Sequence, residues 1–322
     1  MATLTSQEIL NATVSMGVSK ANQCWIARAA NTLLAGMYIA IGGFLAIRIG
    51  LALPWEQWGG MSKLIFGAVF PLGLMLVVLC GADLFTGSCM TLTTAQAKQK
   101  ISFGQTVFTL ATSWLGNFAG ALFVAFFIAY LSGLIFESAG GTMPWAAAVV
   151  NLANAKCSLG FTEALLRGIG CNWLVCLAVF AAAASTETIG KIAALWFPTM
   201  AFVALGMEHC IANMFFIPLG ILTGTDPRYI ALVEAGKAAA LKADFYSFAV
   251  GNLIPVTIGN IIGGWLTDKY GRYSVFMADM FFFVISAIAA GLAPNVWVLI
   301  GARFLMGIGV GIDLPVAMSY LA

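Results

Sequence analysis

The sequence predicts an all-α membrane protein, and three features carry this prediction: a composition poor in charge, long apolar runs and an internal duplication. The chain has 322 residues, of which 61% are hydrophobic and 9% are charged, and its mean hydropathy is +0.97. A soluble domain needs roughly 25% charged residues for a surface that faces water. This chain cannot cover such a surface, but it can face lipid, so we expect it to lie in a bilayer.

The charge balance and the cysteines exclude several other classes of protein. A net charge of +2 favours neither a nucleic acid nor an acidic partner. The seven cysteines lie mostly within apolar stretches and form no CxxC pair, which is typical of small packing residues and not of disulfides or a zinc site. The sequence has no phosphate loop, no metal cluster and no set of nucleophile, histidine and acid. We therefore expect neither a cofactor nor an enzyme.

Eight apolar runs are long enough to cross a bilayer, which requires about 20 residues of helix. Helices are predicted at 30–50, 64–97, 106–133, 160–184, 192–221 and 248–266, followed by two more at 274–292 and 295–313. The polar connections are 55–63, 97–104, 137–156, 185–191, 223–246 and 267–273. Residues 5–22 are predicted to form a short amphipathic helix on the membrane surface. The lysines and arginines of the connections slightly favour a cytoplasmic N-terminus.

Two of these spans are interrupted by glycine and an ionisable residue at mid-membrane depth. The second span contains GADLFTGS at 81–88, and the fifth contains GMEHC at 206–210. Non-helical backbone at that depth must face protein or water. The pattern therefore predicts that both helices break next to a buried, polar path.

The first three spans are echoed by the next three. GNFAG at 116–120 in the third span matches GNIIG at 259–263 in the sixth, and Leu33-Leu34-x-Gly36 in the first matches Leu165-Leu166-x-Gly168 in the fourth. Because three is an odd number of crossings, the second copy must enter the membrane inverted. Inverted repeats with breaks at corresponding positions indicate a transport site near the midplane.

His209, the only histidine in the chain, lies at the second break. A lone histidine is commonly a hydrogen-bonded core residue, but ionisable groups at membrane depth are costly and mark pathways. We therefore expect His209 to line a pore, where imidazole can donate a hydrogen bond to an anion. Glu208 and Asp83, each at a break, are expected to anchor the broken backbone and not to carry protons.

Other polar residues of the spans have two readings. Lys156, just before the fourth span, either attracts anions to the outer mouth or is a snorkelling interfacial lysine, and the sequence favours neither reading. Asn172, Asn117 and Asn260 are expected to be hydrogen-bond partners between helices.

Five motifs in these segments resemble the formate/nitrite transporter family. They are CGADLFTG (80–87), GNFAGA (116–121), RGIGCNWLVCLAVF (167–180), MEHCIANMFFIPLG (207–220) and GNLIPVTIGNIIGG (251–264). The resemblance covers residues 1–264, which we expect to form a channel domain. It implies a six-helix, aquaporin-like inverted repeat with broken second and fifth helices, assembled as a homopentamer with a pore in each protomer, in the inner cell membrane.

The resemblance also implies a substrate and a set of site residues. The substrate is a small monovalent anion, with formate first because GNLIPVTIGNIIGG is closest to formate channels, and with nitrite or hydrosulfide as alternatives. Passage by a channel and passage by proton-coupled symport both stay open. The implied residues are the pore histidine His209; Leu84, Phe85 and Thr86 in the loop that breaks the second helix; Phe70, Leu74 and Phe202 in an outer apolar constriction; Leu84 and Val175 in an inner one; and the polar residues Lys156, Asn172, Glu208, Asn213 and Asn260.

Residues 265–322 resemble a different family. GGWLTDKYGRY (263–273) is similar to the loop between helices two and three of the major facilitator superfamily, and residues 301–322 are similar to its fourth helix. We expect this partial two-helix segment not to transport by itself. Two rival functions follow: a facilitator-type carrier of an organic anion, which would depend on Asp268, Arg272 and Arg303, and a membrane component that binds its anion without flux.

Overall fold

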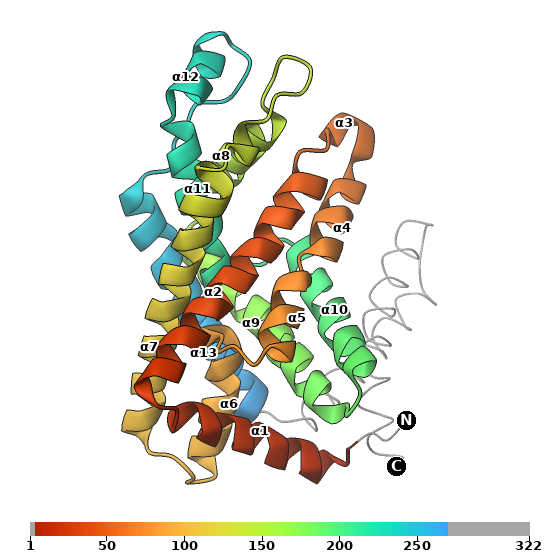
Figure 1. Ribbon diagram of the computed structural model, residues 1–322, viewed down its shortest axis with the longest axis vertical. Helices are drawn as coiled ribbons and strands as arrows, with labels where there is room; N and C mark the ends of the chain where they lie inside the picture. Colours follow the sequence, from red (N-terminus) through yellow and green to blue (C-terminus); the bar gives the residue numbers. More distant parts are fainter. Residues whose placement is uncertain (1–3, 270–322) are drawn as a thin grey trace, which may run out of the picture.

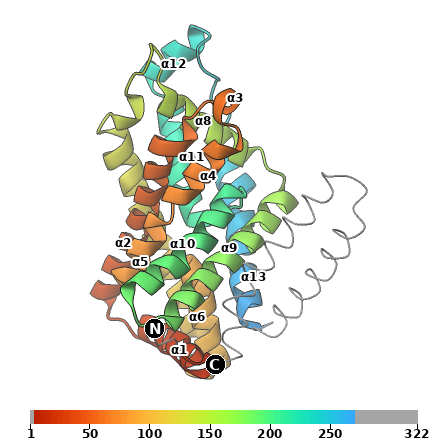
Figure 2. The same ribbon diagram turned by 90° about the vertical axis from the view of Figure 1, so that its right-hand side faces the viewer.

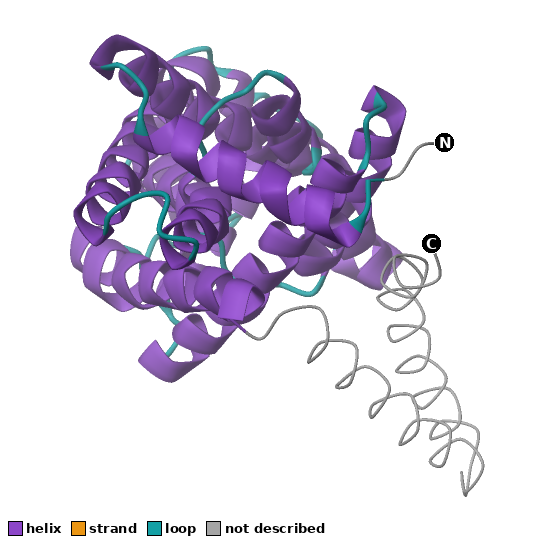
Figure 3. Ribbon diagram, turned by 90° about the horizontal axis from the view of Figure 1, so that it is seen from below, coloured by secondary structure: helices purple, strands orange, loops and turns teal. Residues whose placement is uncertain are grey.

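The computed structural model describes residues 4–269, and these residues form helices joined by loops (Figures 1 and 3). The helices are α1 (Ser6–Ala21), α2 (Trp25–Ala46), α3 (Trp55–Trp58), α4 (Gly60–Val69), α5 (Leu72–Leu79), α6 (Phe85–Ala97), α7 (Phe103–Phe123), α8 (Pro144–Cys157), α9 (Phe161–Ala184), α10 (Thr188–Ala204), α11 (Cys210–Gly224), α12 (Pro227–Glu234) and α13 (Ile254–Lys269). The π-helical turns Ile47–Leu51, Val124–Tyr130 and Ser247–Leu253 extend α2, α7 and α13, and the 3₁₀ turn Leu134–Phe136 follows α7. The predicted helices at 274–292 and 295–313 lie outside the described residues.

Five helical stretches of the described chain are long and apolar enough to cross a membrane. They are Trp25–Leu51, Gly60–Leu79, Phe103–Tyr130, Phe161–Ala184 and Ser247–Thr267. The apolar helices α10 and α11 are shorter, with 17 and 15 residues. The all-helical prediction is therefore confirmed, and the span boundaries differ from the predicted ones mostly at their ends.

Several predicted connections contain helix, among them 55–63, which contains α3, and 223–246, which contains α12. The connection at 137–156 contains α8, whose residues Ala146, Val149, Val150 and Ala153 are buried. Fourteen residues are too few to cross a bilayer, so hydropathy alone did not separate this alanine-rich helix from a loop. The sixth span also does not end before the polar residues, because α13 continues to Lys269.

The predicted surface helix at 5–22 is confirmed as α1, which lies across one end of the bundle (Figures 1 and 2). Its start is fixed by a capping box in which the Thr5 hydroxyl accepts a hydrogen bond from the Glu8 amide and the Glu8 carboxylate accepts one from the Thr5 amide. Gly17 allows α1 to approach α6, because a Cβ there would overlap the Thr91 carbonyl oxygen. α1 is therefore packed on the bundle and not merely adjacent to it.

The matching sequence motifs make matching helix contacts. α2 packs on α7 where a Cβ at Gly120 would overlap the Leu33 carbonyl oxygen, and α9 packs on α13 where a Cβ at Gly263 would overlap the Ile169 carbonyl oxygen. Small residues let membrane helices approach this closely. In these contacts Leu33 of the first half is equivalent to Ile169 of the second half. The sequence motifs instead aligned Leu33 with Leu165, so the structural alignment of the first and fourth spans differs from the sequence alignment by about one helical turn.

Helix is interrupted at both predicted places; the first interruption is shorter than predicted, and the second has the predicted length but begins one residue earlier. Helix is absent between Leu79 and Phe85 and between Ala204 and Cys210, whereas Phe85–Ser88 is already helical. Each preceding helix ends at a glycine in the left-handed region, Gly81 with φ 73° and Gly206 with φ 76°. In each case the amide of the next residue donates to the carbonyl five residues earlier, Ala82 to Val77 at 2.9 Å and Met207 to Phe202 at 3.0 Å. Both breaks thus begin with the same helix-ending motif.

The opposite end of the bundle carries α12, which begins at a buried carboxylate (Figure 1). Asp226 accepts hydrogen bonds from the Arg228 amide and guanidinium, each at 2.9 Å, and from the Tyr130 hydroxyl at 2.8 Å. The bonds from Arg228 lower the pKa of Asp226 to about 2. A carboxyl with a lowered folded-state pKa stabilises the protein above its unfolded-state pKa and loses that effect as the pH falls through the folded-state value.

We expect Asp226→Asn to lower the free energy of unfolding by about 1–2 kcal/mol at pH 7, allowing for the half-exposed guanidinium. The difference from the unsubstituted protein should shrink between about pH 4 and pH 2, where Asp226 becomes protonated. Thermal unfolding midpoints of the purified protein at several pH values measure this. Glu234→Gln, at the exposed end of the same helix, is the control. A difference that persists unchanged to pH 2 would contradict the assignment.

Candidate functional site

His209 and Thr86, which come from the two halves of the chain, meet in the interior of the bundle. The His209 Nε2 atom lies 3.0 Å from the Thr86 hydroxyl, and both residues are buried. The His209 Nδ1 atom accepts a hydrogen bond from the Ala212 amide at 3.1 Å, so the imidazole caps α11. Because Nδ1 is an acceptor, the neutral ring carries its proton on Nε2. The Nε2–H group therefore donates a hydrogen bond to the Thr86 oxygen. The site therefore presents a hydrogen-bond donor.

Aromatic rings cover one side of His209. Phe202 stacks on the imidazole with ring centroids 5.9 Å apart and 17° between the planes. Phe70 meets Phe202 edge-on, with centroids 6.0 Å apart. Leu74 is as buried as these two and belongs to the same hydrophobic cluster. The three residues expected in an outer apolar constriction thus lie in one core, in which Phe202 stacks on His209 and Phe70 meets Phe202 edge-on.

On the other side, α9 holds the backbone of Thr86. The Asn172 side chain donates to the Thr86 carbonyl at 3.1 Å, and the Cys176 thiol donates to it at 3.7 Å. Val175, between these two residues in the sequence, is buried, as is Leu84 at the first break. The residues expected in an inner apolar constriction are therefore both in the interior.

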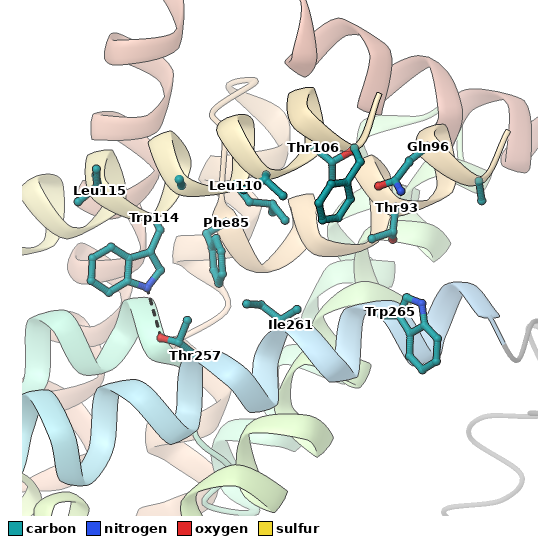
Figure 4. A pocket seen from close by; sticks show the side chains of 14 residues that line it. Phe85, Thr93, Gln96, Thr106, Leu110, Trp114, Leu115, Thr257, Ile261 and Trp265 are labelled. Atoms are coloured by element: carbon teal, nitrogen blue, oxygen red, sulfur yellow. Dashed lines mark hydrogen bonds between the residues drawn. The ribbon is translucent and has the colours of Figure 1, made fainter. Parts of the chain in front are cut away.

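Phe85 is buried at the edge of a groove between α7 and α13. Its side chain lines the groove together with Trp114 and Ile261 (Figure 4). It is the first residue of α6, and its amide donates to the Asn117 side chain at 2.8 Å. Phe85 belongs to the same hydrophobic core as Leu84 and Val175, and it lines this groove as well.

Glu208 is the anchor that its position suggested. One carboxylate oxygen accepts from Lys156 Nζ at 2.8 Å, and the other accepts from Asn213 at 2.6 Å and from Asn252 at 3.2 Å. The side chain of Glu208 is 3% exposed and that of Lys156 is 12% exposed. Such a buried pair is held in place by hydrogen bonds from three elements, which fits the expected anchoring role.

The first break has its own ion pair, which sequence analysis missed. Lys20 Nζ, from α1, lies 3.4 Å from a carboxylate oxygen of Asp83 and donates to the Ser88 hydroxyl at 2.9 Å. Lys20 precedes Thr32 by the same twelve residues that separate Lys156 from Gly168. The structural alignment of the first and fourth spans therefore makes Lys20 equivalent to Lys156. This equivalence of the two lysines could have indicated the Lys20–Asp83 pair from the sequence.

Two asparagines, one at each break, form equivalent sets of hydrogen bonds to the backbone. Asn117 accepts from the Phe85 amide at 2.8 Å and donates to the carbonyls of Asp83 at 2.9 Å and Thr32 at 2.7 Å. Asn260 accepts from the Cys210 amide at 2.9 Å and donates to the carbonyls of Glu208 at 3.0 Å and Gly168 at 2.8 Å. Each amide side chain thus satisfies backbone groups that the broken helix leaves unpaired.

We expect Asn260→Leu, which keeps the side-chain volume, to destabilise the protein by about 3 kcal/mol or more. It leaves the Cys210 amide and the two carbonyls without a partner, and each buried unpaired group costs about 1–3 kcal/mol. Thermal unfolding of the detergent-solubilised protein measures the loss. Asn154→Leu, which removes hydrogen bonds near the exposed loop at 240–243, is the matched control with the smaller expected effect. Equal effects of the two substitutions would contradict the bracing role.

A cavity of about 320 Å³ leads to His209 from the end of the bundle that carries α12. Its lining includes Lys156, Lys63 and Arg167, and the Arg167 guanidinium also pairs with Glu163 and donates to the Gly206 carbonyl at 3.4 Å. Among residues 4–269, no group of three or more histidine, cysteine or acidic side chains is placed to hold a metal ion. The cavity thus joins three cationic side chains and one carboxylate, Glu208 paired with Lys156, to a buried hydrogen-bond donor, and this excess of positive charge is suited to an anion.

Known proteins with similar sequences are membrane transporters. The model of the family "Formate/nitrite transporter" matches residues 7–270. A probable formate transporter of Methanothermobacter thermautotrophicus is 42% identical over 249 residues, which are 72% of this chain and 82% of that protein. The formate channel FocA of Escherichia coli (strain K12) is 36% identical over 253 residues, which are 77% of this chain and 85% of FocA.

A solved structure has the same fold. A pentameric formate channel with formate bound superposes with a TM-score of 0.67 and 31% identity, over 82% of this chain and 99% of that one. A second family model, "Sugar (and other) transporter", matches residues 228–322, so the facilitator resemblance of the C-terminal segment is shown as well.

Proposed function

Because this chain belongs to the formate/nitrite transporter family, we propose that it carries formate across a membrane through a pore in each protomer. The observation that carries the proposal is the position of His209. Its ring stacks on Phe202, which Phe70 meets edge-on, and its Nε2 donor lies 3.0 Å from the hydroxyl of Thr86, two residues after the buried Leu84. If His209 were only a packed core residue, there would be no reason for a cavity lined by cationic side chains to lead to it.

The path gives an anion two different environments. In the cavity, Lys156 and Arg167 raise the local concentration of anions. Beyond it, the apolar side chains oppose a charge far more than a neutral molecule. Formate takes up a proton readily, so it crosses the apolar part as formic acid and keeps one hydrogen bond to His209 on the way. Chloride, which does not become neutral in this way, is disfavoured.

His209 supports this path as a hydrogen-bond donor and not as the source of the proton. Holding a second proton would require Nδ1 to release the Ala212 amide and uncap α11. The proton then comes from solution and travels with the anion. Uptake should therefore rise as the pH on the formate side falls.

The proposed arrangement in the membrane is two inverted halves. α1, α2, the broken α5 and α6, and α7 form one half, and α8, α9, the broken α10 and α11, and α13 form the other. The paired asparagines and the paired ion pairs support this arrangement. We place the N-terminus in the cytoplasm and the protein in the inner cell membrane.

The proposed assembly is a homopentamer of a channel domain, residues 1–264, with the facilitator-like segment 265–322 attached. A pentameric relative supports the number of subunits. Removing residues 270–322, beyond the end of α13 at Lys269, should leave the pentamer intact. Light scattering of the two purified forms measures their masses. A pentamer that forms only after truncation would show that the segment obstructs assembly.

Uptake into proteoliposomes tests the function. Vesicles containing the purified full-length chain should take up formate faster than empty vesicles, and formate should exceed nitrite, hydrosulfide and chloride. Faster nitrite or hydrosulfide uptake would assign the same pore to that anion. Binding of formate without uptake would replace the proposal with the reading of a non-transporting component. Loss of uptake on substitution of Asp268 and Arg272, with His209 dispensable, would favour a facilitator-type carrier.

A further inference from the structure

The groove that contains Phe85 lies on the flank of the bundle, away from His209. It has a volume of about 790 Å³ and runs between α6 and α7 on one side and α13 on the other (Figure 4). Its lining residues are Phe85, Thr93, Gln96, Ala97, Phe103, Thr106, Val107, Leu110, Ala111, Trp114, Leu115, Thr257, Ile261 and Trp265. The Trp114 indole donates to the Thr257 hydroxyl at 3.3 Å and joins the two walls. Most of the lining residues are apolar.

The groove lies at membrane depth, because α7 and α13 are among the helices that can cross a bilayer. Its lining on α7 runs from Phe103 to Leu115, about 18 Å at the rise of an α-helix. One leaflet of the hydrocarbon core is about 15 Å deep. Water does not fill an apolar space of this kind, and an empty one loses the dispersion contacts of its walls. Hydrocarbon chains are what a bilayer offers to fill it.

One end of the groove is followed directly in the sequence by two lysines. Gln96 and Ala97 line that end, and Lys98 and Lys100 follow directly in the connection between α6 and α7. Both lysines are exposed. Trp265 lines the groove near the end of α13, and tryptophan is enriched at the level of lipid headgroups. An elongated apolar groove that ends next to two lysines in the sequence is complementary to a lipid with an anionic headgroup.

We propose that this groove binds one acyl chain of an anionic glycerophospholipid, whose phosphate lies near Lys98 and Lys100. The occupant touches Phe85, the residue that begins α6 directly after the first break. Phe85 is 2% exposed and its amide is held by Asn117, so its ring and the break move together. The lipid thereby stabilises the first break in its present conformation. This consequence for transport rests on the proposed function.

Photolabelling tests the binding site without reference to transport. The full-length chain is placed in vesicles that contain phosphatidylglycerol with a diazirine in one acyl chain, and labelled peptides are identified by mass spectrometry. We expect label on residues 103–115 and 254–265. Ala111→Phe, which fills the groove from its exposed wall, should lower this labelling by about tenfold, which corresponds to 1.4 kcal/mol. Ala119→Phe, exposed on the same helix but outside the groove, should not lower it.

The headgroup is tested by composition and charge. Label carried by phosphatidylcholine should reach these residues less than label carried by phosphatidylglycerol, and Lys98→Gln with Lys100→Gln should lower the phosphatidylglycerol labelling by about tenfold. Equal labelling by the two lipids would overturn the anionic assignment. Equal labelling of the Ala111→Phe and Ala119→Phe variants would overturn the groove as the site. If no lipid were labelled and the same residues formed cross-links between copies of the chain, the occupant of the groove would be a second protomer and the proposal would be wrong.

The effect on transport is read separately. Formate uptake by the unsubstituted chain should be faster in vesicles with phosphatidylglycerol than in vesicles of phosphatidylcholine alone, and Ala111→Phe should remove this difference. Uptake that is independent of lipid, despite specific labelling, would overturn the coupling through Phe85. No uptake in any vesicle would reject the proposed function, and the labelling result would still decide whether the groove binds lipid.

Discussion

Replacing His209 by asparagine is expected to lower formate uptake by about tenfold or more, without unfolding the protein. Asparagine is among the best N-cap residues, so its side-chain oxygen can still accept from the Ala212 amide. It is too short to place a donor where Nε2 now meets Thr86. A hydrogen bond to a charged or polarised group contributes about 1.5–3 kcal/mol, which sets the size of the loss.

Two further substitutions separate the roles of the imidazole. His209→Ala removes the cap as well as the donor, and the unfolding midpoint should fall because an N-cap contributes about 0.5–2 kcal/mol. Thr86→Val removes the hydroxyl that accepts the hydrogen bond from Nε2, and leaves the Nε2–H group free to donate to an anion. It should reduce uptake less than His209→Asn does. If His209→Asn transports formate at the rate of the unsubstituted chain, His209 is not part of the path.

The largest effect is expected from Lys156→Gln. It leaves the Glu208 carboxylate buried beside Asn213 and Asn252 without its counter-ion, and breaking a buried pair in this way costs about 3–5 kcal/mol. It also leaves a negative charge at the inner end of the cavity, where the pair is now neutral. Uptake should therefore fall by about ten- to a hundredfold, because the attraction of anions is weakened. Uptake and the unfolding midpoint should fall together.

The double variant Lys156→Gln, Glu208→Gln decides what the lysine does. Neutral amides can restore much of the hydrogen bonding, so the unfolding midpoint should recover towards that of the unsubstituted protein. Uptake should stay low if Lys156 attracts anions. Recovery of both quantities would instead assign Lys156 the role of an interfacial anchor, the alternative that the sequence left open. Arg48→Gln, which breaks the exposed pair with Glu137, is the control for loss of a cation elsewhere.

The sequence carried the prediction of the breaks and of His209 because the signals were local. Glycine beside an ionisable residue inside an apolar run is unfavourable in a membrane helix, and both such places proved to be breaks. The GNxxG motifs also sit where α2 meets α7 and α9 meets α13. In these cases the residues that form the feature lie within a few turns of each other.

Features that depend on distant contacts could not be predicted in the same way. The Lys20–Asp83 pair joins α1 to a break in a different helix, and Asn252 reaches Glu208 from the π-helical turn that precedes α13. The direction of the Phe85 ring depends on how α6, α7 and α13 pack, which hydropathy does not report. α8 was missed because its alanines are apolar enough to be buried but too few to resemble a span.

The paired asparagines bear on biogenesis. Every bond from Asn117 to the first break is made within residues 32–117, and every bond from Asn260 to the second is made within residues 168–260. Each half can therefore satisfy its exposed backbone groups soon after it leaves the ribosome and enters lipid. The contacts that join the halves, His209 to Thr86 and Asn172 to Thr86, form only when the halves dock. The site is thus assembled last, from parts that are already satisfied.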